Sequence, residues 1–153
     1  MNDPRPTGIL DTSAVILLPR LTDPGSLPER PTITAVTLAE LSVGPLVARS
    51  AEERAARQAH LQQAEADFDP LPFDDRAARA FGQVAASLRS AGRKTGARAY
   101  DALIAATAIA NELPLHTANP ADFSGIAGLQ VVVIPHPDAD ADAHPDPDRD
   151  PDE

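Results

Sequence analysis

The amino-acid sequence predicts an α/β fold in which a central, mainly parallel sheet is covered by helices on both faces. Short β-rich runs alternate with helical patterns from residue 7 to residue 135. Parallel strands need long crossover connections, which are usually helices, so this alternation favours a parallel sheet. The helical pattern over 98–111 is also apolar almost all round, as expected for a helix in the interior of such a fold.

Turn and cap residues place the elements of the first half of the chain. Asp11 or Thr12 can cap a helical turn, whereas four prolines and one glycine over 19–31 predict a loop. A Gly-Pro pair at 44–45 ends the next helix. The expected elements are a strand over 8–10, a helical turn over 12–18, a strand over 32–34 and a helix over 35–43.

The second half begins with a capping box at Ser50 and Glu53, whose side chains satisfy each other's free backbone donors. Asp74 caps a later helix, which Gly92 closes. Prolines confine 69–72 to a weak strand at a sheet edge. The expected elements are helices over 51–66, 75–91 and 98–111, the edge strand, and strands over 113–117 and 130–134.

The composition is that of one ordinary globular domain with a polar tail. The chain has 153 residues, of which 42% are hydrophobic and 24% are charged. We assign residues 1–136 to the folded domain. Residues 137–153 are rich in Pro, Asp and Ala without apolar periodicity, so they predict a disordered acidic tail. A solubilising role is expected for this tail, and binding to a basic partner is the alternative.

The net charge of −10 does not exclude a nucleic-acid partner, because eight acidic residues and one arginine lie from residue 138 onward. The absence of Cys excludes disulfides and thiolate metal sites. No run reaches the roughly 18 apolar residues of a membrane span, and the N-terminus lacks the pattern of a secretion signal. A cytoplasmic protein is therefore expected.

Four carboxylates lie where apolar segments begin or end. Asp11 closes the first strand, Glu40 lies in an apolar helix, Asp101 opens the central helix and Asp122 follows a late strand. A buried carboxylate must be paired, protonated or bound to a metal, and only Arg98 is near enough in sequence to pair with any of them. Ligands bind beyond the carboxyl ends of parallel strands, where the strand order reverses, so a shared cation is expected there.

Oxygen ligands alone select a hard cation, which means Mg²⁺ or its close substitute Mn²⁺. Two such ions would serve phosphodiester hydrolysis, since one activates water and the other stabilises the leaving oxygen. No side-chain general base is then required, and none of the four histidines is placed for that role. His116, within a strand, is interpreted as a core residue whose hydrogen bonds are satisfied.

Each acid also has a purely structural interpretation. Asp11 and Asp122 could cap helical turns, Glu40 could be a solvated helix residue, and Asp101 could cap a helix or pair with a nearby arginine. Their joint occurrence favours the metal site. Two other functions stay open. One is phosphotransfer with Asp11 as the nucleophile, although Ser13 stands where such phosphatases usually carry a second Asp. The other is a non-catalytic interaction module.

Four short segments carry these residues in order: Leu10-Asp11-Thr12-Ser13-Ala14, Thr37-Leu38-Ala39-Glu40-Leu41, Tyr100-Asp101-Ala102-Leu103-Ile104-Ala105-Ala106-Thr107-Ala108 and Thr117-Ala118-Asn119-Pro120-Ala121-Asp122-Phe123. With a closing valine strand over 131–133, they resemble the PIN-domain ribonucleases, and within them the VapC-like toxins of toxin–antitoxin pairs. The resemblance covers residues 8–135. It implies an α/β/α sandwich, an RNase activity that depends on Mg²⁺ or Mn²⁺, a homodimer, and inhibition by a cognate antitoxin.

The resemblance also implies roles for individual residues. Catalytic and metal-binding acids are implied at Asp11, Glu40, Asp101 and Asp122. Asn119 takes a position that some members fill with Asp, which makes it a further candidate metal ligand. Hydroxyls that orient the ligands or water are implied at Thr12, Ser13 and Thr117.

A basic stretch leads into the central helix. Between Arg89 and Arg98 there are four basic residues and no acid, and two glycines predict a flexible loop. The functional hypothesis is that Arg93, Lys94 and Arg98 contact RNA phosphates, and the alternative is a solvated basic loop.

The few aromatic residues are expected to be structural. Tyr100 could stack on a base, but a packing role is preferred. Core positions are expected for Phe73, Phe81 and Phe123.

Overall fold

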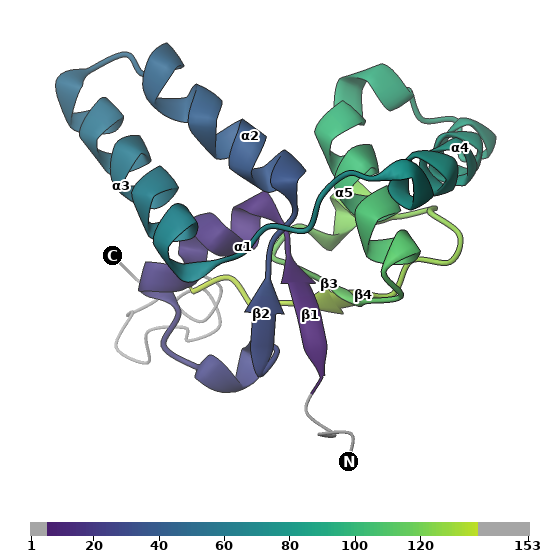
Figure 1. The fold of residues 1–153 in the computed structure, drawn as a ribbon, viewed down its shortest axis with the longest axis horizontal. Coiled ribbons are helices and arrows are strands. Elements are labelled where there is room, and N and C mark those ends of the chain that lie inside the picture. The colour runs from purple at the N-terminus through teal and green to yellow at the C-terminus, as the bar shows by residue number, and fades with distance from the viewer. Residues whose placement is uncertain (1–5, 138–153) are drawn as a thin grey trace, which may run out of the picture.

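The structure, a computed structural model that describes residues 6–137, contains in that part of the chain a four-stranded parallel sheet (Figure 1). The strands are β1 (Thr7–Leu10), β2 (Arg30–Thr32), β3 (Leu115–Thr117) and β4 (Val131–Val133). Their order across the sheet is β2-β1-β3-β4, and every pair is parallel. The chain builds outward from β1 to β2 and then returns to place β3 on the other side of β1. The strand order therefore reverses between β1 and β3, as the sequence predicts.

Helices connect the strands, as the crossover rule requires. The first four α-helices each have a side-chain cap at the N-terminus, whereas α5 directly follows a 3-10 turn, η4 (Thr95–Arg98), and has no such cap. The α-helices of the described residues are α1 (Thr12–Leu17), α2 (Ala35–Val43), α3 (Ala51–Asp67), α4 (Asp75–Ser90) and α5 (Ala99–Ala110).

Two buried clusters divide the molecule into three layers. Successive strand residues point to opposite faces of a sheet, so Ile9 and Leu10 belong to different clusters. Ile9 packs with α4 and α5 through residues such as Leu88 and Ile104, and Leu10 packs with α1 and α3 through residues such as Val15. Figure 1 shows α4 and α5 together on one side and α1 and α3 on the other. The expected α/β/α sandwich is confirmed.

The second strand lies earlier in the chain than the sequence analysis places it. It spans Arg30–Thr32, because Thr34 instead caps α2 with its hydroxyl, which accepts from the Thr37 N–H at 3.1 Å. The expected edge strand over 69–72 is reduced to one parallel bridge between Thr34 and Leu71. The segment expected to be a flexible loop before the central helix contains the 3-10 turn η4.

Several expectations about single residues are also settled. Phe123 is buried and Phe81 packs against the core, but Phe73 is 38% exposed, so its core assignment is wrong. Tyr100 is 50% exposed and is not a packing residue. His116 is buried, yet its Nδ1 has no hydrogen-bond partner among the residues described here, so the interpretation as a satisfied histidine is wrong.

The acidic tail predicted over 137–153 lies, from residue 138 on, outside the described residues. Over the described range, no helix combines the length and the apolar character needed to cross a membrane.

Candidate active site at the carboxyl edge of the sheet

The four acids predicted from the sequence come from four segments that meet where the strands end. Asp11 directly follows β1, and Asp122 lies in η5 (Pro120–Phe123), the 3-10 turn after β3. Asp101 is in the first turn of α5, which begins at this edge because the helix runs back toward the start of β3. Glu40 lies in the second turn of α2, which follows β2.

Asp11 is held by hydrogen bonds to both of its carboxylate oxygens. Oδ1 accepts from the Ala14 N–H at 2.9 Å and from Ser13 Oγ at 2.7 Å, so Asp11 caps α1. Oδ2 accepts from Thr117 Oγ1 at 2.5 Å. The residue is 4% exposed, and this burial raises the pKa of its carboxyl above the usual value, against the lowering effect of the three hydrogen bonds. Asp11 therefore caps α1 with one oxygen and contacts β3, at the candidate site, with the other.

Glu40 is tied to α1 through a threonine hydroxyl. Thr12 Oγ1 lies 2.8 Å from Glu40 Oε1 and 3.1 Å from Thr37 Oγ1. An ionised carboxylate only accepts, so Thr12 donates its proton to Glu40 and can accept from Thr37. Burial raises the pKa of Glu40, and repulsion from Asp11 adds to this rise.

Asp101 carries the largest electrostatic perturbation of the four acids. Its pKa is raised to about 6, first by burial and then by repulsion from Asp122, Glu40 and Asp11, in that order. Arg98 acts in the opposite direction. Asp101 thus experiences the charges of the other three acids, which confirms that they occupy one electrostatic neighbourhood.

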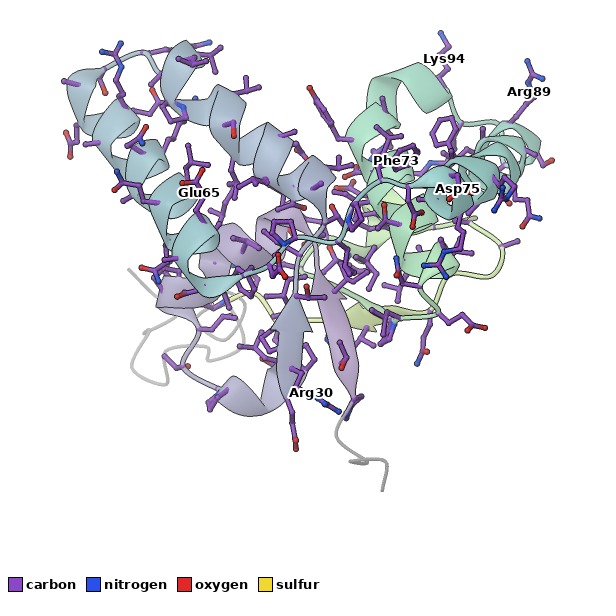
Figure 2. The ribbon with its side chains drawn as sticks, viewed as in Figure 1. Arg30, Glu65, Phe73, Asp75, Arg89 and Lys94 are labelled. Carbon is purple, nitrogen blue, oxygen red and sulfur yellow. The ribbon has the colours of Figure 1, made fainter. Side chains whose placement is uncertain are left out.

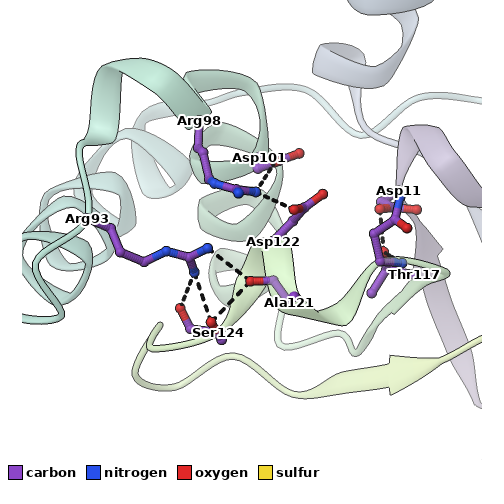
Figure 3. A network of polar contacts seen from close by, with 9 residues as sticks. Asp11, Arg93, Arg98, Asp101, Thr117, Ala121, Asp122 and Ser124 are labelled. Carbon is purple, nitrogen blue, oxygen red and sulfur yellow. Dashed lines mark hydrogen bonds and ion pairs between the residues drawn. The ribbon is translucent and has the colours of Figure 1, made fainter.

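Arg98 provides the positive charge within this neighbourhood (Figure 3). Its Nη1 donates to Asp122 Oδ1 and lies 4.0 Å from Asp101 Oδ2. The three side chains are about one-third exposed. A single guanidinium therefore bridges two of the four acids.

Arg93 lies five residues before Arg98 and donates hydrogen bonds to the segment that carries Asp122. Its Nη1 donates to the Ser124 carbonyl and hydroxyl at 2.7 and 2.9 Å, and its Nη2 donates to the Ala121 carbonyl at 3.0 Å (Figure 3). These bonds hold η5 and the following Ser124 against the segment that joins α4 to η4. Lys94 is exposed, and Figure 2 shows it pointing away from the body of the protein.

The hydroxyl residues implied by the resemblance all contact acids of the site. Thr12 bonds Glu40, whereas Ser13 and Thr117 bond Asp11. Thr117 Oγ1 also accepts from the Asn119 N–H at 3.0 Å. Asn119 itself is exposed, so its side chain faces solvent beside the acids.

The donor chemistry of the site fits a hard divalent cation. All of its acids are oxygen donors, and their mutual repulsion at Asp101 is the kind of charge accumulation that a cation relieves. As the side chains stand, no three His, Asp or Glu groups between residues 6 and 137 are spaced to share one ion. Since Asp122 is turned toward Arg98, its release is one of the movements that shared binding would need.

A model of a known protein family matches the part of the chain that carries these acids. The PIN domain model matches residues 9–129, which is most of the chain. The chain belongs to the PIN-domain family. The matched range of this PIN domain contains Asp11, Glu40, Asp101 and Asp122.

Individual relatives place this PIN domain among the VapC proteins. Ribonuclease VapC5 of Mycobacterium tuberculosis (strain ATCC 25618 / H37Rv) is 40% identical over 129 residues, covering 83% of this chain and 93% of that protein. The crystal structure of VapBC-5, a toxin–antitoxin system of Mycobacterium tuberculosis, matches with a TM-score of 0.71 and 38% identity over 84% of this chain and 98% of that chain. DNA-bound VapBC from Salmonella typhimurium matches with a TM-score of 0.68 and 25% identity, over the same shares of each chain.

Sequence reasoning missed two features of the site. The Arg98–Asp122 pair joins residues 24 positions apart, and only the packing of α5 against η5 brings them together. Thr37, which supports Thr12, is a buried helix residue that the sequence analysis did not assign to the site. Its position in the motif Thr37-Leu38-Ala39-Glu40-Leu41, one turn before Glu40, is the signal that could have identified it.

Proposed function

We propose that this PIN domain is an endoribonuclease that depends on Mg²⁺ or Mn²⁺ and acts as the toxin of a toxin–antitoxin pair. The observation that carries the proposal is the gathering of Asp11, Glu40, Asp101 and Asp122 where the strand order reverses, with the Asp101 pKa raised to about 6. The relatives named as VapC ribonucleases support RNA as the substrate.

The four acids would hold the metal, and Asn119 lies beside them as a further candidate ligand. When bound, Mg²⁺ or Mn²⁺ would polarise the attacking water and stabilise the charge that develops on the leaving oxygen. In the overall reaction, water adds across one phosphodiester bond, which leaves a phosphate on one fragment and a hydroxyl on the other.

The residues of the chain have the task of holding the acids in a fixed orientation. Both oxygens of Asp11 are held in place by three donors from α1 and β3. Thr12 fixes Glu40 Oε1 and leaves its other oxygen for the ligand. Such preorganisation lowers the reorganisation needed during the reaction.

Basic residues beside the acids would bind the RNA backbone. Arg98, once released from Asp122, and exposed Lys94 are placed on the segment that leads into α5. Arg93 already uses three of its five N–H donors on η5, so its contribution is mainly to position Asp122.

The two alternative functions fit the geometry less well. Phosphotransfer through Asp11 lacks the second Asp that such phosphatases usually carry, because Ser13 stands at that position and donates to Asp11 Oδ1. A non-catalytic module has no need for a cluster of acids in which burial, and then repulsion between carboxylates, raises the pKa values of Asp11, Glu40 and Asp101 at a cost in stability.

The proposal extends to partners and compartment. Relatives have been solved as VapBC toxin–antitoxin complexes, which supports a cognate antitoxin as the inhibitor of this chain. We also propose a homodimer, as the family resemblance implies, and a cytoplasmic location.

The test is RNA cleavage by the purified chain with and without divalent metal. Asp11→Asn and Asp101→Asn should each abolish cleavage while the circular dichroism spectrum is retained, and EDTA should do the same until Mn²⁺ is restored. Asp75→Asn, on an exposed site of α4, is the matched control and should cleave normally. Cleavage that persists in EDTA would contradict the metal mechanism, and retained cleavage in Asp11→Asn would contradict the site.

A further inference from the structure

An exposed aromatic ring stands directly beside the acids. Tyr100 is 50% exposed, although its neighbours Ala102 and Ile104 on the same helix are buried. Tyr100 precedes Asp101, so the ring projects from the first turn of α5, at the carboxyl edge of the sheet. An aromatic ring that is exposed at this edge is placed where a ligand of the site can contact it.

The ring forms one wall of a cavity of about 260 Å³ that reaches the proposed metal site. The cavity is lined by Glu40, Gly96, Arg98, Ala99, Tyr100 and Asp101. Its lining combines an aromatic side chain, the small residues Gly96 and Ala99, a guanidinium and two carboxylates. Anything that fills this cavity therefore lies against the acids proposed to act on the phosphodiester.

We infer that this cavity is a nucleobase site, in which an unpaired base of the RNA stacks on the Tyr100 ring while the adjoining phosphate lies at the acids. The inference rests on the proposed function and adds a base-binding contact to it. Proteins that bind single-stranded RNA commonly stack bases on aromatic side chains and on arginine guanidinium planes. Arg98, which also lines the cavity, can supply a second such plane.

The charges of the cavity favour a base over a phosphate as its occupant. The lining places two carboxylates, Glu40 and Asp101, against one guanidinium, so the cavity itself repels an anion. A neutral base has flat apolar faces for the ring and amino groups that carboxylates can accept from. Single-stranded RNA is the form that can supply such a base, because the bases of a duplex are paired and stacked.

The chain carries its own reporter for the test. Tyr100 is its only tyrosine and there is no tryptophan, so tyrosine emission reports on this ring alone. We would titrate a short mixed-sequence single-stranded RNA into the full chain carrying Asp11→Asn, with Mn²⁺ present, and follow both emission and affinity. Stacking should quench the emission, and Tyr100→Ala should weaken RNA binding about fivefold or more.

Two variants separate stacking from other effects. Tyr100→Phe keeps an aromatic face and should restore most of the affinity. Phe73→Ala removes another partly exposed aromatic, which does not line the cavity, and should bind RNA normally. The salt dependence of binding should be the same with and without the tyrosine ring, because stacking releases no counterions.

The outcomes distinguish this inference from the proposed function. If the Asp11→Asn chain binds RNA and Tyr100→Ala binds it equally well, or if emission is unquenched at saturation, the base site is refuted and the nuclease proposal stands. If the chain binds no RNA at all and the unsubstituted chain cleaves none, both fail together.

Discussion

The guanidinium of Arg98 joins Asp122 to Asp101: Nη1 donates to Asp122 Oδ1 and lies 4.0 Å from Asp101 Oδ2. The pair forms across 24 residues, between the turn before α5 and the turn after β3. It offsets part of the repulsion among the acids, since Arg98 lowers the Asp101 pKa that burial and the other carboxylates raise. Arg98 therefore occupies the electrostatic role that a bound cation would take over.

Removal of this arginine should tighten metal binding. In Arg98→Gln the acids lose their internal counter-ion, and Asp122 is free to turn toward the metal. We expect the dissociation constant for Mn²⁺ to fall by up to about fivefold, because an ion pair as exposed as this one stabilises by at most about 1 kcal/mol. Isothermal titration calorimetry on the unsubstituted chain and the variant would measure the change.

Arg89→Gln is the control for a general change in charge, because Arg89 is an exposed residue at the end of α4. It should alter the Mn²⁺ affinity by less than Arg98→Gln does. Weaker Mn²⁺ binding in Arg98→Gln would contradict the idea that Arg98 and the metal compete for the same acids. It would instead indicate that Arg98 holds Asp122 in its ligand position.

The raised pKa of Asp101 predicts a specific dependence of stability on pH in the metal-free chain. The folded state holds this proton up to about pH 6, whereas the unfolded chain loses it near 3.8. Between these pH values the folded state binds more protons than the unfolded state, so the free energy of unfolding falls as the pH rises. At pH 7 the ionised Asp101 costs about 1 to 2 kcal/mol, after allowance for solvent screening at a side chain that is 29% exposed.

Asp101→Asn should therefore unfold at higher urea concentration than the unsubstituted chain at pH 7 in EDTA, and the difference should shrink toward pH 4. Added Mn²⁺ should stabilise the unsubstituted chain and reduce its disadvantage. A difference that is constant from pH 4 to pH 7 would show that ionisation of Asp101 has no part in it.

The location of the site was predictable from the sequence because it depends on simple features. Asp11 directly follows an apolar β-rich segment, Asp122 comes five residues after the end of another, and Asp101 lies in the first turn of an apolar helix, so each lies near one end of a buried element. The parallel topology then requires these ends to meet at one edge. Local burial patterns and one topological rule were sufficient for this part of the site.

The contacts within the site depend on packing, and the sequence does not reveal packing. The same arginine could pair with Asp101 three residues away or with Asp122, and only the docking of η5 beside α5 decides in favour of Asp122. Tyr100 and Phe73 look like core residues in an aromatic-poor chain, but their exposure depends on which side of α5 and of the segment before α4 faces solvent. Thr34 belongs to a β-rich run, yet its hydroxyl caps a helix, and this shifts β2 toward the N-terminus.

Gly→Ala substitutions should have opposite effects on stability at Gly8, where β1 closely approaches β3, and at Gly82, which lies in open space on α4. A Cβ at Gly8 would lie 2.5 Å from His116 Nε2 and 2.9 Å from Pro28 Cβ, so Gly8→Ala should destabilise by about 1 to 3 kcal/mol. A Cβ at Gly82, inside α4, would meet nothing within 4 Å, so Gly82→Ala should stabilise by about 0.5 to 1 kcal/mol. Urea unfolding of both variants measures the two effects, and equal changes would contradict the steric explanation.

Thr12 links the acid of α2 to the acid of β1, since it follows Asp11 in the chain and donates to Glu40 at 2.8 Å. Thr12→Val keeps the shape and removes the donor, so Glu40 loses its fixed orientation and its pKa should rise further. We expect RNA cleavage to fall about fivefold to thirtyfold, because loss of one hydrogen bond to a charged group costs about 1 to 2 kcal/mol. Thr12→Ser restores the hydroxyl and should recover most of the activity. If Thr12→Val cleaves RNA as fast as the unsubstituted chain, Glu40 needs no orienting partner, and its part in metal binding would have to be tested separately by Glu40→Gln.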